Sequence, residues 1–379
     1  MKAKSVEKVL VTGGAGFIGS HTVDALAKSG YQVNILDNLD PQVHSKGTPE
    51  YLNENAAFVK GDLRDRDLLR RILPDVDAVI HMAATVGVGQ SMYEVERYVD
   101  TNTLGTATLL QALINKEHSV RKLVVASSMS VYGEGKYHCE KCSSYAYPRL
   151  RSEEQLRKRV WDHLCPVCKS ALSPMPTDES KPLTPTSIYA MSKRHQEETS
   201  LLIGETYGIR TTALRYFNVY GSRQALANPY TGVCAIFSSR ILNGNRPYVF
   251  EDGNQSRDFI HVKDVARANL AALQRNGADF TPVNIGTGSP ISIRRLAETL
   301  VALYGSNMRP YVSNEYRKGD IRHCYADISA ARRLLEFEPT VSLQDGLIEL
   351  IGWAKAERWG VVDLFEKTLE ELREKELTA

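Results

Sequence analysis

The sequence contains no apolar run of the ~18 residues that a membrane-spanning helix requires. It also has no marked excess of either charge, because 47 Lys and Arg residues stand against 45 Asp and Glu, a formal net charge of +2. Such a chain lacks the strongly basic surface that attracts nucleic acid, so we expect neither a membrane nor a nucleic acid as a partner. Its first residues, MKAKSVEKVLVT, lead from a basic stretch into a short strand, without the apolar segment of a signal peptide. We therefore expect a cytoplasmic protein.

Cysteine is scarce, with six residues in 379. In a reducing compartment such thiols are more often metal ligands or buried side chains than disulfides. Four of them form two pairs, Cys139-x-x-Cys142 and Cys165-x-x-Cys168, separated by the 22 residues 143–164. Four thiolates on two such turns suit a closed tetrahedral site, which predicts structural zinc. A redox pair or two buried turns are the alternatives.

The first 130 residues alternate short apolar runs with segments of helix length. The runs cover residues 6–12, 31–37, 56–62, 77–83 and 122–128. Apolar strands without polar alternation are typical of a parallel sheet buried on both faces. Their alternation with helices predicts right-handed βαβ units, and so an α/β fold with a doubly wound parallel sheet of the Rossmann type.

A glycine-rich turn follows the first strand. The segment Val9–Thr12 runs directly into GGAGFIGS, whose glycines lack the Cβ atom that would keep the backbone from a pyrophosphate. The pyrophosphate would lie at the positive end of the next helix. This context predicts a dinucleotide site. The turn residues expected to contact the cofactor are Gly13, Gly16, Phe17, Ile18 and Gly19.

Acidic residues end the second and third strands. Asp37 lies about twenty residues beyond the glycines, where a carboxylate accepts hydrogen bonds from the adenosine ribose and repels a 2′-phosphate. No arginine follows in DNLDPQVH, which favours NAD over NADP. A simple capping aspartate is the alternative. We expect Asn38 to contribute beside Asp37, and Asp62 with Leu63 to lie beside the adenine, although Asp62 is also suited to capping a turn.

Tyr189 and Lys193 stand four residues apart in YAMSK, so on a helix they share one face. A phenol has an ordinary pKa near 10, and a nearby ammonium together with the nicotinamide's positive charge would favour its anion, the form that accepts a proton. The alternative is a solvated helix face. Ser127 and Ser128 end the strand VVASS, where a hydroxyl can bond a substrate oxygen.

Together, TGGAGFIG, HMAA at 81–84, Asn102, ASSMSVYG and YAMSK resemble the extended short-chain dehydrogenase/reductase family, the group of nucleotide-sugar epimerases and dehydratases. The resemblance runs from residue 6 to about 350, outside the cysteine segment. It implies that Ser128 is the catalytic serine, Tyr189 the base, and Lys193 the residue that holds the nicotinamide ribose and lowers the tyrosine's pKa. Further implied cofactor contacts are Ala83, Ala84, Asn102 and Ser127.

The resemblance also implies a nucleotide-diphosphate sugar as substrate. Asn218 matches the residue that bonds the phosphate region, and Arg257 and Arg317 with Asp320 match the groups that hold the diphosphate and the ribose. A guanidinium suits phosphate and a carboxylate suits a diol, although surface salt bridges are the alternative for both arginines. The full implied set is Gly87, Ser128, Asn218, Arg257, Arg317, Asp320 and Cys324. Cys324 matches a position that gates the pocket, and its small side chain predicts a roomy one.

The choice of reaction depends on two neighbours of Ser128. Related dehydratases carry an acidic pair directly after the catalytic Ser or Thr, whereas this chain has Met129 and Ser130, which disfavours dehydration. Residues 81–102 match UDP-galactose 4-epimerase-like enzymes without gaps, and the cysteine segment resembles that of dTDP-L-rhamnose 4-epimerase-type enzymes. We therefore expect C4 epimerisation through a 4-keto sugar on retained NAD. The alternatives are a 4-ketoreductase, an oxidative decarboxylase and a non-catalytic dinucleotide sensor.

These interpretations divide the chain into domains. Residues 1–215 are expected to form the NAD-binding domain, interrupted by a zinc-ribbon-like insertion at 134–176. Residues 216–379 mainly bind the nucleotide sugar, with 255–290 returning to the first domain. The insertion separates two residues that must meet, so it must loop out at the mouth of the site, where it could fold over the sugar as a lid. Helices over 95–116 and 188–206 are expected to form the homodimer interface common in the family.

Overall fold

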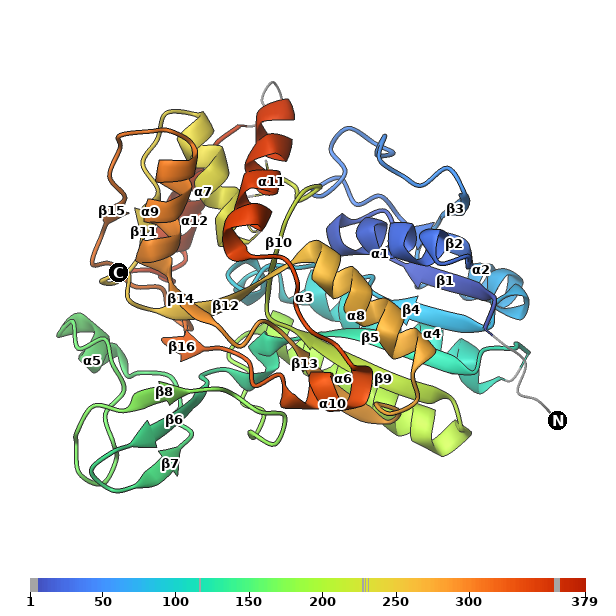
Figure 1. Cartoon of the computed structure of the whole chain (residues 1–379), viewed down its shortest axis with the longest axis horizontal. Helices are drawn as coiled ribbons and strands as arrows, with labels where there is room; N and C mark the ends of the chain where they lie inside the picture. The colour runs from blue at the N-terminus through green and yellow to red at the C-terminus, as the bar shows by residue number, and fades with distance from the viewer. Residues whose placement is uncertain (1–5, 116, 227, 229, 231, 358–361) are drawn as a thin grey trace.

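The structure is a computed structural model that describes residues 6–115, 117–226, 228, 230, 232–357 and 362–379. Its main sheet has seven strands, all parallel, in the order β3-β2-β1-β4-β5-β9-β13 (Figure 1). The strands are β1 (Lys8–Thr12), β2 (Gln32–Asp37), β3 (Ala56–Lys60), β4 (Ala78–His81), β5 (Lys122–Ser128), β9 (Arg210–Tyr216) and β13 (Thr281–Ile285). The predicted doubly wound parallel sheet is confirmed, and the five predicted apolar runs are its first five strands.

Helices cover both faces of this sheet because its strands are apolar on both sides. Val9 and Val11 of β1 pack into one core cluster, whereas Leu10 between them packs into another on the opposite face. On one face α1 packs against α8, and on the other α4 packs against α2 and α6. The helices of this region are α1 (Phe17–Lys28), α2 (Arg66–Ile72), α3 (Val95–Tyr98), α4 (Gly105–Ile114), α6 (Ile188–Tyr207) and α8 (Val262–Gln274), with short 3₁₀ turns at Leu73–Asp75, Gln90–Met92 and Met129–Tyr132.

Two of the expected helices differ from the pattern in the sequence. The helix predicted over 95–116 begins at Val95 but passes through a π-helical stretch, Val99–Leu104, before α4. Residue 116 lies outside the described residues. The helix expected after the glycine turn begins at Phe17, inside the glycine motif itself. Its N-cap, Gly16, makes no side-chain cap hydrogen bond, which leaves backbone N–H groups at this end of the helix free to meet an anion.

The rest of the chain forms smaller sheets and helices beside the carboxyl ends of the main strands. One sheet joins β10 (Asn218–Tyr220), β12 (Ser256–His261), β14 (Pro290–Ser292) and β16 (His323–Cys324), and another joins β11 (Tyr248–Val249) with β15 (Tyr311–Val312). The helices here are α7 (Val233–Leu242), α9 (Ile293–Leu303), α10 (Ser329–Leu335), α11 (Leu343–Ala356) and α12 (Phe365–Glu374). None of the helices in the described ranges is long and apolar enough to cross a membrane.

The cysteine segment forms a small module outside the main sheet, at the lower left of Figure 1. It contains an antiparallel sheet of order β7-β6-β8 and one short helix. These elements are β6 (Lys136–Cys139), β7 (Ser144–Ala146), β8 (Ser173–Met175) and α5 (Glu153–Arg157). The domain limits given above stay a prediction, although β13 does return to the main sheet after the chain has formed β10 to β12.

Candidate active site

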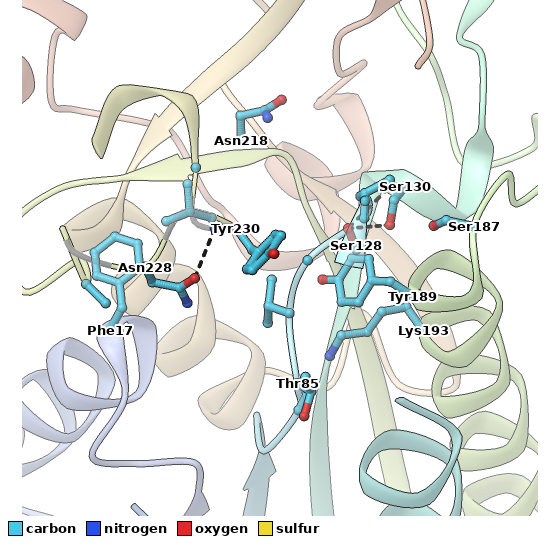
Figure 2. A pocket seen from close by; sticks show the side chains of 18 of the residues that line it. Phe17, Thr85, Ser128, Ser130, Ser187, Tyr189, Lys193, Asn218, Asn228 and Tyr230 are labelled. Atoms are coloured by element: carbon cyan, nitrogen blue, oxygen red, sulfur yellow. Dashed lines mark hydrogen bonds between the residues drawn. The ribbon is translucent and has the colours of Figure 1, made fainter. Parts of the chain in front are cut away.

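A cavity of about 650 Å³ opens at the carboxyl ends of the main strands and extends to the smaller sheets and α12. Both parts of the fold contribute to its wall, as Figure 2 shows from close by. Ligands of doubly wound sheets bind at this end, because helix N-termini and loops converge there. Of the predicted cofactor and substrate residues, all except Asn102 and Cys324 line the cavity.

The glycine turn is packed so closely that two of its positions exclude a side chain. Gly13 has φ +71°, and a Cβ built there would lie 2.8 Å from the backbone nitrogen of Ala83. A Cβ on Gly19 would lie 2.1 Å from the carbonyl oxygen of Gly13. Thr12, the residue before the turn, holds the segment after β4 beside it, since its Oγ1 accepts hydrogen bonds from the backbone N–H groups of Met82 (3.2 Å) and Ala83. These contacts leave a bare backbone facing the cavity.

Asp37 is buried at the end of β2 and already has backbone partners. Its carboxylate accepts hydrogen bonds from the N–H groups of Ala15 (3.0 Å) and Leu39 (2.9 Å). The carboxylate therefore fixes the glycine turn and also lines the cavity. Asp62 lines it as well, accepts from Asn38 and binds Arg64, whose hydrogen bonds hold the pKa of Asp62 well below its usual range. Arg64 was not expected here, and it also pairs with Asp100.

The residues predicted to form the reaction centre lie where α6 packs against β5. Tyr189 and Lys193 lie one turn apart on α6 next to Ser128, the last residue of β5 (Figure 2). Ser187 caps the helix by accepting a hydrogen bond from the N–H group of Ala190, 3.1 Å away. This cap fixes the first turn of α6, and with it the position of Tyr189.

The two titratable groups are shifted by their burial. Burial raises the pKa of Tyr189 to about 12, and a hydrogen bond with the Ser128 hydroxyl opposes that rise. Burial also lowers the pKa of Lys193 to about 7. The Lys193 ammonium donates to the carbonyl oxygen of Ala126, 2.9 Å away, which directs it to the floor of the cavity. In the protein alone, the lowering contribution to the pKa of Tyr189 comes from Ser128.

Ser130 has a role that the sequence pattern did not reveal. Its hydroxyl donates to Ser128 Oγ at 2.8 Å, and its backbone N–H points to the same oxygen at 3.2 Å. With both hydrogen bonds accepted, the Ser128 proton is free to be donated to Tyr189. Ser130, which in the sequence was only an argument against dehydration, therefore also orients the Ser128 hydroxyl.

Two of the expected site residues lie outside the cavity wall. Asn102 is fully buried and holds the cavity-lining residue Thr85, accepting from its N–H at 2.7 Å and donating to its carbonyl oxygen at 3.0 Å. It positions the loop after β4 and is not itself at the surface of the cavity. Cys324 is buried in the core beside Thr177. The segment that lines the cavity ends at Ile321, and Cys324 lies beyond it in β16, which pairs with β12. The structure does not support the expectation that Cys324 gates the pocket.

The substrate end of the cavity carries the expected polar groups. Arg257 donates to the carbonyl oxygens of Ile321 (2.6 Å) and Arg322 (2.9 Å), and Arg317 binds Asp320 at 2.7 Å. Asn218 Oδ1 is buried and has no hydrogen-bond partner among the described residues. An orphaned buried acceptor in a cavity wall is costly unless a ligand bonds it.

The far wall of this end was not foreseen. Aromatic and aliphatic side chains from distant segments line it, namely Tyr230, Tyr248, Phe250, Phe365, Leu372 and Leu377. Residues 316–318 pair with the last residues of the chain, with Lys318 N–H donating to Leu377 at 2.8 Å and Tyr316 N–H to Ala379 at 2.8 Å. Nothing local in the sequence signals this pairing.

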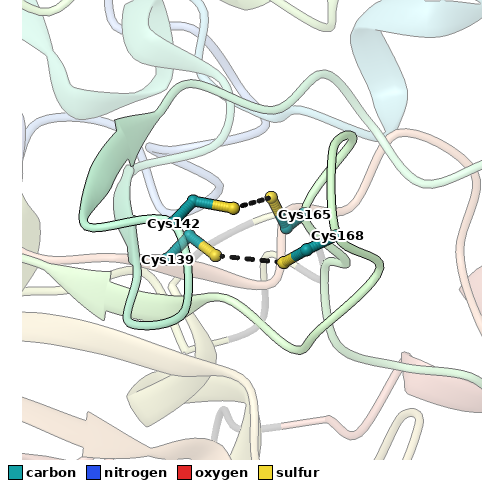
Figure 3. A group of neighbouring side chains, drawn as sticks. All are labelled: Cys139, Cys142, Cys165 and Cys168. Atoms are coloured by element: carbon teal, nitrogen blue, oxygen red, sulfur yellow. Dashed lines mark hydrogen bonds between the residues drawn. The ribbon is translucent and has the colours of Figure 1, made fainter.

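The four paired cysteines converge in the module (Figure 3). Their sulfur atoms all lie within 4.8 Å of one another. Two of the separations are 3.4 Å, between Cys139 and Cys168, and 3.9 Å, between Cys142 and Cys165. Sulfur atoms of a tetrahedral zinc site with bonds of about 2.3 Å lie about 3.8 Å apart, so the donor set and its spacing fit zinc.

The comparisons with known proteins agree with this geometry. The model of the NAD dependent epimerase/dehydratase family matches residues 9–286. The chain belongs to this family. A dTDP-L-rhamnose 4-epimerase of Burkholderia thailandensis is 35% identical and aligns with 93% of this chain and 96% of its own length.

Two solved structures of 4-epimerases from this family are similar over nearly the whole chain. The UDP-N-acetylglucosamine 4-epimerase of Methanobrevibacter ruminantium M1, in complex with UDP-N-acetylmuramic acid, has a TM-score of 0.76 at 35% identity, with 93% of this chain and 100% of that chain covered. A variant of the UDP-glucuronic acid 4-epimerase of Bacillus cereus, in complex with UDP-4-deoxy-4-fluoro-glucuronic acid and NAD, has a TM-score of 0.75 at 29% identity, covering 92% and 99%. The predicted family and fold are thus confirmed.

Proposed function

We propose that this protein is an NAD-dependent nucleotide-sugar 4-epimerase. The observation that carries the proposal is the contact of Ser128 with Tyr189 in a cavity that also holds Lys193, the glycine turn and the arginines. The three similar proteins described above are each named as 4-epimerases, which supports the same reaction. Met129 and Ser130 stand where a dehydratase would need an acid and a base, which argues against loss of water.

The cofactor end of the cavity fits NAD. The bare backbone of the glycine turn and the uncapped start of α1 suit the pyrophosphate, and the buried Asp37 carboxylate suits the adenosine ribose. Lys193 would hold the nicotinamide ribose. When bound, NAD supplies the group that takes the C4 hydride and returns it, and its nicotinamide carries a positive charge.

Tyr189 moves the proton of the C4 hydroxyl. As phenolate it accepts that proton while the C4–H bond breaks, and as phenol it gives the proton back when the hydride returns. Ser128 bonds the same sugar oxygen and stabilises the phenolate through its hydrogen bond. Because the ordinary pKa of a phenol is near 10 and burial raises it further here, the cationic groups of the loaded site must stabilise the anion.

The nucleotide diphosphate would be held apart from the reacting atoms. Arg257 and Arg317 suit its phosphates and Asp320 suits a ribose diol, whereas the orphaned oxygen of Asn218 can accept a hydrogen bond only from a hydroxyl or N–H group of the ligand. With the nucleotide held there, the 4-keto sugar can rotate and present the other face of its ring to the hydride. Gly87 lines the cavity, and a Cβ there would lie 2.7 Å from the buried Tyr98 hydroxyl, so the packing of the wall excludes a side chain at this position.

The proposal is tested by incubating the purified protein, without added cofactor, with a panel of UDP- and dTDP-linked sugars and following C4 configuration by NMR. We expect at least one pair of C4 epimers to interconvert, and NAD to stay with the protein through gel filtration. A protein that consumes free NADH stoichiometrically is a 4-ketoreductase, and one that releases CO₂ from a uronic acid is a decarboxylase. Either result would refute the 4-epimerase assignment.

The metal of the module is proposed to be zinc, in a structural role. All four donors come from the chain, which leaves no open position for a substrate, and none of the four cysteines lines the cavity that holds Tyr189. The apolar packing of the module is small: Tyr137 and Leu172 pack with the cysteines, and Leu156 and Trp161 pack with Tyr316 outside it. A metal would therefore supply stability that so small a core cannot provide.

A homodimer through the helical segments 95–114 and 188–207 is proposed from apolar side chains that are exposed on α3, on the π-helical stretch Val99–Leu104 and on α6. Val95, Val99, Leu104, Met191 and Leu202 are all exposed there, and α6 contacts both α3 and α4. Exposed apolar surface of this kind marks interaction sites, and helices packed in fours form stable interfaces.

The dimer is tested by placing a charge on that surface. We expect Leu202→Glu to convert a dimer to a monomer in gel filtration with light scattering, because burying the new carboxylate in the interface carries a desolvation cost that no partner charge offsets. The matched control is Ile348→Glu, which puts the same charge on an exposed apolar position of α11 and should leave the dimer intact. A dimeric Leu202→Glu variant would exclude this interface.

A further inference from the structure

The insertion does not cover the cavity, which contradicts the expectation of a lid. None of its described residues, 134–176, lines the cavity wall. The module lies instead against the outer side of residues 317–321, the segment between β15 and β16, which we call the strap. All five strap residues line the cavity, and among them are Arg317 and Asp320, which the proposed function assigns to the nucleotide diphosphate.

A buried cluster of charges joins the module to the strap. Arg151 of the module is 1% exposed and forms a two-point ion pair with Glu251, with distances of 2.9 and 2.8 Å. The same guanidinium donates to the backbone carbonyl oxygen of Asp320 at 3.1 Å. Arg151 therefore contacts the strap directly. It also contacts the strap indirectly through Glu251, because the neighbouring Phe250 lines the cavity and its ring stacks under the Arg317 guanidinium of the strap.

The other end of the strap is held by the same cluster. Arg322, directly after the strap, donates to Asp162 of the module at 2.8 Å, to Glu251 at 2.9 Å and to both carboxylate oxygens of Asp252. Its backbone N–H donates to the buried Glu134 at the start of the module. Its carbonyl oxygen accepts from Arg257, the second proposed phosphate ligand.

The segment that supplies these contacts lies between the two cysteine pairs. Arg151 and Asp162 both lie between Cys142 and Cys165, so a metal that joins the two cysteine pairs closes the loop that carries them. Closing a loop lowers the entropy cost of fixing the residues within it. Buried ion pairs tolerate little displacement, because a separated charge in the interior is left without a partner. The position of the strap thus depends on an ordered module.

We propose that the insertion is a buttress for the nucleotide-binding strap, with Arg151 as its positioning residue. This inference rests on the proposed function, which assigns the strap to a nucleoside diphosphate. Arg151 does not touch the reacting atoms, so its loss weakens binding of the nucleotide while hydride transfer from bound substrate continues. The C-terminal residues pair with the other edge of the strap and do not replace these contacts.

The test compares Arg151→Met with Lys158→Met. Lys158 is an exposed cation of the same module, and its ion pair in the described chain is with Glu154, which is also exposed. Calorimetry with UDP and with dTDP measures affinity without any turnover. For whichever of the two nucleotides binds more tightly, we expect Arg151→Met to weaken the affinity at least about tenfold and to raise the KM of the nucleotide sugar similarly. The kcat should stay within threefold, and the zinc and NAD content should be unchanged. Lys158→Met should bind within twofold of the original protein.

The outcomes separate the two proposals. If the original protein binds neither nucleoside diphosphate, the proposed function fails. If it binds one of them and a zinc-loaded Arg151→Met binds within twofold of it, the buttress fails alone. Should Arg151→Met not fold, Asp162→Asn replaces it, since that side chain is 56% exposed and its loss leaves Arg322 paired with Glu251 and Asp252. We expect at least threefold weaker binding there, and unchanged binding would overturn the inference.

Discussion

Replacing Tyr189 by phenylalanine is expected to lower kcat at least about 10³-fold, because the variant loses the group that accepts and returns the C4 hydroxyl proton. Nucleotide-sugar affinity and NAD content should stay within about threefold, since the phosphates and the cofactor are held by other residues. The ring remains, so its edge-to-face contact with Tyr98 is kept. The measurement is steady-state and single-turnover interconversion of the C4 epimers.

The matched control for this experiment is Tyr207→Phe, the same change at the exposed end of the same helix. It should leave kcat unchanged. A Tyr189→Phe variant that keeps a third or more of the original kcat would show that another group transfers the proton.

Ser130→Ala provides a graded check, because Ser128 then loses the hydroxyl donor that orients it. We expect a smaller fall in kcat, about tenfold.

Replacing Cys168 by serine is expected to empty the metal site and loosen the module. The remaining three thiolates hold zinc more weakly, so the zinc content should fall from about one ion per chain to near zero after dialysis against a chelator. Loss of a few kcal/mol of folding free energy should lower the Tm by roughly 5 °C or more. Elemental analysis and calorimetry measure the two effects.

Cys324→Ser is the control for the metal prediction, because it makes the same change at a buried thiol outside the cluster. Its zinc content should match that of the original protein. If Cys168→Ser also keeps one zinc per chain, or loses zinc with no change in Tm, the metal is not the structural element that the module requires. The first result would exclude Cys168 as a ligand, and the second would exclude a stabilising role.

The parts of the fold and site that the sequence predicted are those encoded within short segments. The strand–glycine–helix turn, the last serines of β5 and the tyrosine–lysine turn of α6 each depend on residues less than about ten positions apart. Local spacing fixes their geometry once strands and helices form. The cysteine cluster was also predictable, because two Cys-x-x-Cys pairs at this separation are typical of a metal site.

The parts that could not be predicted depend on long-range packing. Arg151 meets Glu251 across 100 positions of sequence, and the strap is paired with the end of the chain. The lid was a reasonable expectation from the position of the insertion between Ser128 and Tyr189. The sequence does not indicate, however, against which surface of the protein the module packs. Cys324 was assigned by its offset from Asp320, whereas the turn into β16 carries it into the core.

The most direct test of the central claim follows the hydrogen at C4. A nucleotide sugar that the protein converts is prepared with deuterium at C4 and incubated in ordinary water without added cofactor. If the hydride passes to bound NAD and returns to the same sugar, the 4-epimer forms with its deuterium retained, and both epimers keep the label at equilibrium. Loss of the label to water, or its appearance in released NADH, would contradict the account.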